Sequence, residues 1–429
     1  MQLSSLIRLD GEFRGFARAL GEAYRAINPH PIAVSGLAGG ALSAFLTESV
    51  REAREVSAGP VLVIVRDEGE RERVTRLLSA SGIRALGYKR RELVFHNIRA
   101  SHDVDRERLS VLSRLLRGDC DAVVTTPAAA ATYTIPRGML DALSFSARLG
   151  DEISPEKMAK RLVSLGFAAV DAVDGVGQFS RRGGILDFWD ADGKEPTRVE
   201  FFGDEIDRIS HFDPISQRSG EGVSSFEMLP AREVIVDKEA RARVALAVDK
   251  LIKGAKDAET RDRLAREAAV LSSDASIDFC DKYLGLIYPT HECLFSYFDK
   301  RAVVFVLDSR GCAEDIKKHE EYYSETSASL TSLGAVTESA AAYTGGVSSY
   351  EAFLAQNLVV HENAFSGGAP EKLSGLFGFR TRKTVAYGDN GRMLIEDITS
   401  LRRALYRVVL VCETRAGADS LISALADAD

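Results

Sequence analysis

The chain has 429 residues, of which 45% are hydrophobic and 28% charged, and its formal net charge is −8. This length exceeds what one ordinary core organises, so the sequence predicts several domains of a soluble globular protein. The negative charge argues against a protein that coats nucleic acid through bulk charge. No apolar run approaches the roughly 18 residues that span a bilayer. The five scattered cysteines lack zinc-knuckle or redox spacing, so we expect a cytoplasmic protein without a metal site or a membrane anchor.

Short β-rich runs alternate with amphipathic helical segments in the first 143 residues. The run IAVS at 32–35 leads into a helical pattern, and VLVIV at 61–65 leads into another that Gly82 can end. A further helix-then-strand pair follows, with a break at Gly118. This order predicts a parallel sheet covered by helices, of the P-loop or RecA-like kind.

The pattern then changes to short strands joined by tight turns. Ser154 and Pro155 suit the start of one helix, and Gly166 suits its end. After this helix, residues 178–212 have the alternation of an antiparallel meander. We therefore expect a small α+β insert at 144–225.

Helical patterns return from residue 226, and an apolar strand follows at 302–308. The segment 324–346 is rich in small and polar residues, so it predicts a loop or linker. Residues 346–429 predict a small α/β domain whose last part has the order helix, strand, helix. No closing strand follows that unit, so we expect the chain to be part of a longer protein.

A phosphate loop would lie directly after the first strand, where Gly36, Gly39 and Gly40 stand. These glycines let the backbone turn tightly and present N–H groups. A working loop also needs a lysine followed by Ser or Thr, and the matching pair here is Gly39 and Gly40. The first lysine of the chain is Lys89, so no shift of register supplies one. We expect a degenerate loop whose glycines serve a turn, and no nucleotide cofactor.

The carboxylate that would hold magnesium is expected at the end of a later strand. Asp308 follows an apolar run, but Ser309 and Arg310 stand where an Asp-Glu pair would place its glutamate. Both halves of an ATP site lack their chemistry, so we expect no ATP hydrolysis by this chain.

Two adjacent arginines, Arg181 and Arg182, precede two glycines and an apolar strand. Arginine pairs with carboxylates in a planar, two-pronged geometry and is a frequent interface anchor. The alternative is an ion pair inside the same sheet, with Glu200, Asp204 or Glu205 as the partner. The residues by themselves leave both interpretations open.

Other signals favour structural roles. The run DADGKE at 190–195 begins like a calcium loop, but glycine and lysine take its fourth and fifth positions, so it predicts a hairpin turn. His96 and His102 have no companion ligand at metal spacing. The basic and aromatic segment 88–95 predicts a solvated loop, with contact to DNA as the alternative. Trp189 predicts a core residue.

A long composite motif runs from Gly177 to Ser219: GQFSRRGGILDFW, and then RVEFFGDEIDRISHFDPISQRS. It resembles the module shared by the excision-repair subunit UvrB and the transcription-repair coupling factor (Mfd) family. The segments at 101–117 and 121–130 also resemble the first domain of the coupling factors. The chain lacks both the phosphate-loop lysine and a run long enough for the aromatic hairpin of UvrB. Both departures are typical of the coupling factors.

The resemblance implies a domain order. It assigns a UvrB-like domain 1A to 1–143, a UvrA-binding domain 2 to 144–225, a domain 1B to 226–345 and a small domain 3 to 346–429. It also implies a module that recruits UvrA to stalled transcription complexes. RNA polymerase and DNA would be bound by other parts of a longer ATP-dependent DNA translocase. The alternative function is an ATP-dependent excision-repair helicase subunit of UvrB type.

The resemblance also implies which residues dock UvrA. Arg182 is the matching arginine, with Arg181 beside it and with Asp187 and Phe188 in the strand that follows. We expect Arg182 to pair with an acidic residue of UvrA and Phe188 to supply an apolar contact. A further arginine of the family belongs in the preceding strand, where this chain has Ala168.

Overall fold

The computed structural model describes residues 3–93, 95, 103–255, 257–273, 280–298, 301–362, 372–382, 387, 390–406, 408–410 and 414–426. The chain divides into two compact units, a larger one of Met1–Leu37 with Ala41–Arg380 and a smaller one of Ala38–Gly40 with Thr381–Asp429. Within the described ranges, no helix has both the length and the apolar character that a membrane span requires.

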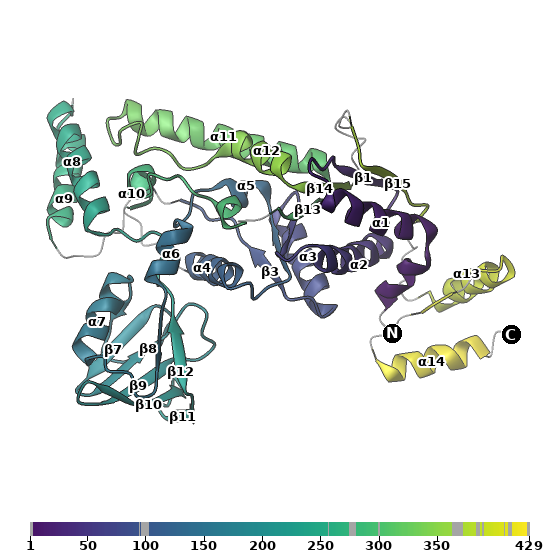
Figure 1. Cartoon of the computed structure of the whole chain (residues 1–429), viewed down its shortest axis with the longest axis horizontal. Helices are drawn as coiled ribbons and strands as arrows, with labels where there is room; N and C mark the ends of the chain where they lie inside the picture. The colour runs from purple at the N-terminus through teal and green to yellow at the C-terminus, as the bar shows by residue number, and fades with distance from the viewer. Residues whose placement is uncertain are drawn as a thin grey trace. The chain divides into compact units, whose positions relative to one another are not determined.

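A seven-stranded sheet forms the centre of the larger unit (Figure 1). Its strands are β1 (Ile32–Ser35), β2 (Val61–Ile64), β3 (Ala85–Tyr88), β4 (Ala122–Thr125), β13 (Val303–Val306), β14 (Leu358–Glu362) and β15 (Gly375–Gly378). The spatial order is β15-β1-β14-β13-β2-β4-β3, and every neighbouring pair is parallel. The predicted α/β class with a parallel sheet is therefore confirmed.

Alternate residues of the strands face two different hydrophobic cores, because successive side chains of a strand project to opposite faces. In β2, Val61 and Val63 join one core, and Leu62 and Ile64 join the other. The first core is completed by α1 (Gly11–Arg25), α2 (Gly40–Val56) and α3 (Glu68–Ala80). The second core is completed by α4 (Asp103–Leu116), α5 (Pro127–Ala131), α6 (Arg137–Leu143), α8 (Lys238–Gly254), α9 (Ala258–Leu271), α10 (Leu284–Ile287), α11 (Ser309–Ser332) and α12 (Gly346–Gln356). Strands buried on both faces explain why their sequences are continuous apolar runs.

The chain between α6 and α8 builds a different structure, which we call the insert (residues 145–228). It contains the helix α7 (Pro155–Ser164) and the strands β5 (Phe145–Arg148), β6 (Ala168–Ala169), β7 (Gln178–Arg182), β8 (Ile185–Phe188), β9 (Thr197–Phe202), β10 (Glu205–Phe212), β11 (Ser219–Gly222) and β12 (Ser225–Met228). Strands β11-β10-β9-β8-β7-β6 form one sheet, mostly antiparallel, and β12 pairs with β5 in another. These strands have a hydrophobic core of their own. The exact limits of 144–225 stay a prediction.

The predicted start and end signals of α7 are confirmed. Ser154 Oγ accepts a hydrogen bond from the backbone N–H of Lys157 at 3.3 Å, and Pro155 takes the first helical position. Gly166, with φ of +84°, follows the helix, where a left-handed residue turns the chain into β6.

The prediction of a loop at 324–346 was wrong for its first part, because α11 continues to Ser332. Ile316, Tyr323 and Leu330 are buried at heptad spacing along this helix, so packing carries it through a segment of small polar residues. Gly334, with φ of +65°, then turns the chain out of the helix. Composition alone hid this periodicity.

The boundary expected at residue 346 also differs from the structure. Helix α12 and strands β14 and β15 belong to the larger unit, since β14 lies between β13 and β1 in the sheet. The smaller unit contains α13 (Gly391–Arg403) and α14 (Arg415–Ala426). The strand expected between these helices is not formed by residues 408–410, the part of that segment that the structure describes.

Candidate docking surface and degenerate phosphate loop

The arginine pair lies at the end of β7, where the chain turns through Gly183 and Gly184 into β8. Gly183 has a φ of +62°, and the carbonyl of Gly184 accepts a hydrogen bond from the N–H of Phe201 at 2.8 Å. The register places Arg182 opposite Ile185, so the hairpin is tight, and β8 pairs on its other side with β9. Successive side chains alternate, so Arg181 and Arg182 project to opposite faces of the sheet.

The inner face of this sheet packs against α7. Leu186, the partner of Arg181 in the register, is fully buried there. Arg181 itself is exposed at the margin of this face. The pKa of Glu156, at the start of α7, is lowered mainly by a hydrogen bond from Lys160, and the positive charge of Arg181 lowers it further. Arg181 therefore lies on the α7 side of the sheet.

The outer face carries Arg182 and a buried carboxylate. Asp187 is 1% exposed and accepts three hydrogen bonds. One comes from Arg182 Nη2 at 2.9 Å, and two come from Arg198 Nε and Nη2 at 2.7 and 2.8 Å. Two guanidinium groups against one carboxylate leave a surplus positive charge. The side chain of Arg182 remains 53% exposed, so this charge is presented to solvent in a fixed orientation.

Arg198 is held from several sides. Its Nη1 donates to the backbone carbonyl of Gln217 at 3.1 Å, and its guanidinium lies 4.6 Å above the ring of Phe212. The hydrogen bonds to Asp187 raise the pKa of Arg198 above its ordinary value. Gln217 adopts a left-handed φ of +59°, and its side-chain amide donates to the carbonyls of Val173 and Pro214. The turn that follows β10 thus supports the arginine beneath Asp187.

The sequence analysis did not single out Arg198 or Gln217. The alternation of the strand could have indicated Arg198, because it precedes a core residue and so projects to the outer face, where Asp187 lies opposite it. The alternative prediction of an ion pair inside the sheet named Glu200, Asp204 or Glu205 as the partner, whereas the structure pairs Arg182 with Asp187.

Phe188 is buried, so its side chain cannot contact a partner directly. Its side chain is 0% exposed, and its ring centroid lies 5.1 Å from that of Phe226 and 6.4 Å from that of Phe167. Alternation places Phe188 on the inner face, where an aromatic ring gains most from burial. The expected apolar contact from Phe188 is therefore corrected to a role in the core. Ala168 is exposed on β6, opposite Gln178 of β7.

The loop after β1, which the sequence predicts to be a degenerate phosphate loop, is contacted by the chain's own backbone. Gly36 follows β1 with a φ of +77°, and a Cβ atom there would stand 1.9 Å from the carbonyl oxygen of Phe379. Phe379 donates its N–H to the carbonyl of Ser35 at 2.9 Å, and its ring packs 5.4 Å from that of Phe45. The segment after β15 therefore fills the space beside Gly36.

Gly39 and Gly40 occupy the positions of the missing Lys-Thr pair. Gly39 has a φ of +53°, a conformation that strains any L side chain, and Gly40 begins α2. Ala38 donates its N–H to Thr381 Oγ1 at 2.7 Å. These contacts agree with the structural interpretation of the glycines.

Asp308, the candidate for the magnesium carboxylate, is used by a helix cap. Its side chain accepts a hydrogen bond from the N–H of Gly311 at 3.1 Å and from Arg66 Nη1 at 3.4 Å. Ser309 Oγ lies 2.9 Å from Nδ1 of His361, and Arg310 pairs with Glu314. Among the described residues, no three His, Cys, Asp or Glu side chains gather as a metal site would require.

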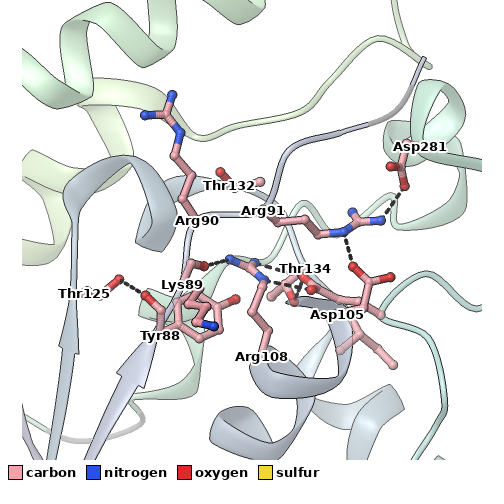
Figure 2. A network of polar contacts seen from close by, with 12 residues as sticks. Tyr88, Lys89, Arg90, Arg91, Asp105, Arg108, Thr125, Thr132, Thr134 and Asp281 are labelled. Carbon is pink, nitrogen blue, oxygen red and sulfur yellow. Dashed lines mark hydrogen bonds and ion pairs between the residues drawn. The ribbon is translucent and has the colours of Figure 1, made fainter. Parts of the chain in front are cut away.

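The prediction of a solvated loop at 88–95 was wrong for Tyr88, Arg91 and Leu93, which are buried. Figure 2 shows Arg91 reaching between Asp105 of α4 and Asp281 of the 3-10 helix η2 (Cys280–Tyr283), at 2.6 Å from each. Arg91 is 6% exposed. The carboxylates that compensate its charge come from distant parts of the chain, so the local composition could not reveal them. His96 and His102 lie outside the described residues.

Arg108 of α4, labelled in Figure 2, belongs to a second buried ion pair. It donates to both carboxylate oxygens of Glu233, at 2.7 and 2.9 Å, and both side chains are fully buried. Thr134 Oγ1 donates to Glu233 at 2.6 Å, and the guanidinium lies 4.0 Å from the ring centre of Tyr88. Glu233 follows the insert, so this pair fastens the returning chain to α4.

The DADGKE run forms a turn, as predicted. The indole N–H of Trp189 donates to the carbonyl of Gly193 at 3.0 Å, and Trp189 is half-buried rather than in the core.

Two aspartates of this turn bind other parts of the chain. Asp190 accepts a hydrogen bond from the N–H of Leu229, and burial raises the pKa of Asp190 to about 6. Asp192 accepts from Ser110 Oγ at 2.5 Å. The turn thus also contacts α4.

Comparison with known proteins finds a family model that matches the insert. Residues 145–234 match the model of the UvrB interaction domain. This range contains the arginine pair, Asp187 and Arg198.

Parts of the chain are similar to proteins named transcription-repair-coupling factor. It is 30% identical over 275 residues to that of Bacillus subtilis, covering 62% of this chain and 23% of the relative. The Myxococcus xanthus relative is 36% identical over 142 residues, 33% of this chain and 12% of the relative. The Staphylococcus aureus USA300 relative is 23% identical over 332 residues, 75% of this chain and 28% of the relative. The alignments thus span about a quarter of the longest-matched relatives' length, and the resemblance predicted from the sequence is confirmed.

Proposed function

We propose that this chain recruits UvrA as the UvrB-like module of a transcription-repair coupling factor. The observation that carries the proposal is Arg182. It lies within the residues that match the UvrB interaction domain, it is exposed, and it belongs to a cluster with surplus positive charge. Such a pre-oriented guanidinium suits an acidic group on a partner protein.

The chain acts without ATP hydrolysis in this proposal. The missing lysine, the left-handed Gly39 and the backbone of Phe379 beside Gly36 all support it. A phosphate group also needs a cation at that position, and Gly39 and Gly40 supply none.

The remaining steps belong to the longer protein that we propose for this chain. RNA polymerase binding and ATP-driven movement on DNA are assigned to parts outside these 429 residues. The chain's own task is then to bring UvrA, in the cytoplasm, to the place where transcription has stalled.

Two binding measurements on the purified chain test the proposal. Saturable binding of UvrA, together with no binding of labelled ATP in the presence of magnesium, is the expected result. Micromolar affinity for ATP would instead favour the alternative, an ATP-dependent excision-repair subunit of UvrB type. Absence of UvrA binding would refute the recruiting role.

A further inference from the structure

An exposed aromatic side chain lies two strands away from Arg182 in the same sheet. Phe202, the last residue of β9, is 81% exposed, whereas its neighbour Phe201 packs against the core of the insert. Ile185, opposite Arg182 in the register, is 36% exposed. Alternation along β9 places Phe202 on the same face as Arg198, which is the face of Arg182.

The register fixes a row of side chains across the outer face. Arg182 of β7 faces Ile185 of β8, Ile185 faces Glu200 of β9, and Glu200 faces Arg208 of β10. Phe202 lies two residues after Glu200 on the same face of β9, at the turn that leads into β10. The row therefore has an arginine at each end and an apolar side chain within it.

Arginines and carboxylates are both present on this face. Arg208 lies 3.6 Å from Glu200, and its side chain is 52% exposed. Three arginines (Arg182, Arg198 and Arg208) share the face with three carboxylates (Asp187, Glu200 and Glu205), and Glu205 is the register partner of Phe202. An aromatic anchor with arginines at its rim is the composition that protein interfaces favour.

The tip that carries Phe202 is held in place. The N–H of Ile153 donates to the carbonyl of Asp204 at 2.7 Å, and the N–H of Ile206 donates to the carbonyl of Asp151 at 3.0 Å. Gly203, with φ of +66°, closes the turn after Phe202. A ring presented on a fixed backbone loses little conformational entropy when it binds.

We propose that Phe202 is the apolar anchor of the docking surface, with Ile185 at its side. The partner surface that fits is an apolar socket edged by carboxylates, which would meet Arg182 and Arg208. The proposal rests on the proposed function, so the partner is UvrA. It assigns to Phe202 the contact that the sequence had assigned to the buried Phe188.

The test measures the affinity of UvrA for the full chain and its variants. Phe202→Ala is expected to weaken binding by about thirty-fold, as for an interface anchor, with the thermal unfolding temperature unchanged. The loss should persist at high salt, because it removes apolar contact. Arg208→Ala should weaken binding mainly at low salt, where rim charges act most strongly.

The matched control is Val163→Ala. Val163 is 58% exposed on α7, which covers the inner face of the sheet, so its truncation should leave UvrA affinity unchanged. If Phe202→Ala binds like the wild type while Arg182→Ala is weakened, the anchor is wrong and the recruiting role stands. If the wild-type chain does not bind UvrA, both proposals are overturned.

Discussion

Asp187 decides how the arginine pair can work. Its buried carboxylate binds Arg182 and Arg198 on one face, while Arg181 projects to the other face beside α7. Strand alternation accounts for the separation of the two arginines. The partner of Arg182 could not be predicted, because it depends on which residue of β8 lies within reach across a two-glycine turn. Phe188 was misplaced for a related reason, since resemblance carries residue identity but not the face.

His319 is a buried titratable residue that makes stability depend on pH. It is 0% exposed on α11, with Nδ1 at 3.2 Å from Arg90 Nη2 and Nε2 at 3.1 Å from Thr132 Oγ1. Arginine only donates, so Nδ1 accepts and the proton of the neutral ring is on Nε2. Burial, and then the charges of Arg90 and Arg108, lower the pKa of His319 to about 3.

A histidine whose pKa is lower in the folded than in the unfolded protein destabilises the fold when the pH falls far enough to protonate the unfolded state. Its contribution is complete above the unfolded pKa of about 6.5 and is lost as the pH falls from there toward the folded pKa. At pH 5 the loss amounts to about 2 kcal/mol. We expect the free energy of unfolding in urea to fall by that much more between pH 7 and pH 5 in the wild type than in His319→Gln. An equal fall in both would show that the ring does not titrate in this range.

At the scale of elements, strands and helices could be predicted where the local sequence has a regular apolar pattern or a clear helix cap. The apolar run of β2 and the cap of α7 were both predictable, because their residues determine the local conformation. The continuation of α11 to Ser332 was not predictable from composition, since Leu330 anchors it through packing against the core. The contact between Gly36 and Phe379 joins residues far apart in the chain, so the sequence indicated only that the glycine turns.

Gly36→Ala tests whether the degenerate loop is closed by the segment after β15. The added Cβ would collide with the carbonyl oxygen of Phe379, and the alanine would have to keep the left-handed φ of the glycine. We therefore expect a destabilisation of at least about 2 kcal/mol in chemical unfolding. Gly82→Ala is the matched control, because Gly82 has a similar φ of +79° and nothing within 4 Å of its Cβ position. It should show the conformational cost alone, about 1 kcal/mol. Equal costs for the two variants would mean that Phe379 yields without penalty.

At the scale of the whole molecule, the larger unit is a domain that the chain leaves and re-enters. Glu233 is bonded to Arg108, a residue 125 positions away in the sequence, directly after the insert has ended. The sequence predicted an interrupted domain from the change of strand pattern, but not the buried ion pair that fastens its two parts. The placement of β14 and β15 in the same sheet was missed, because a short apolar strand does not indicate which sheet it joins.

Removal of one member of this pair should unfold the junction. Arg108→Met leaves Glu233 buried without its cation, and we expect a loss of about 3–5 kcal/mol in the free energy of unfolding. The double variant Arg108→Met with Glu233→Met removes both charges and should recover much of that loss. Chemical denaturation of the single and double variants measures the coupling. A double variant as unstable as the sum of the singles would contradict the account.

The central claim is that this chain binds UvrA through the outer face of the insert, and the neighbouring arginines test it most directly. The measurement is the dissociation constant of UvrA for the wild type, Arg182→Ala and Arg181→Ala. We predict that Arg182→Ala weakens binding by about thirty-fold, at about 2 kcal/mol for an interface anchor. Arg181→Ala should stay near the wild-type value, since its side chain lies on the other face. Equal affinities for the two variants, or wild-type affinity for Arg182→Ala, would contradict the claim.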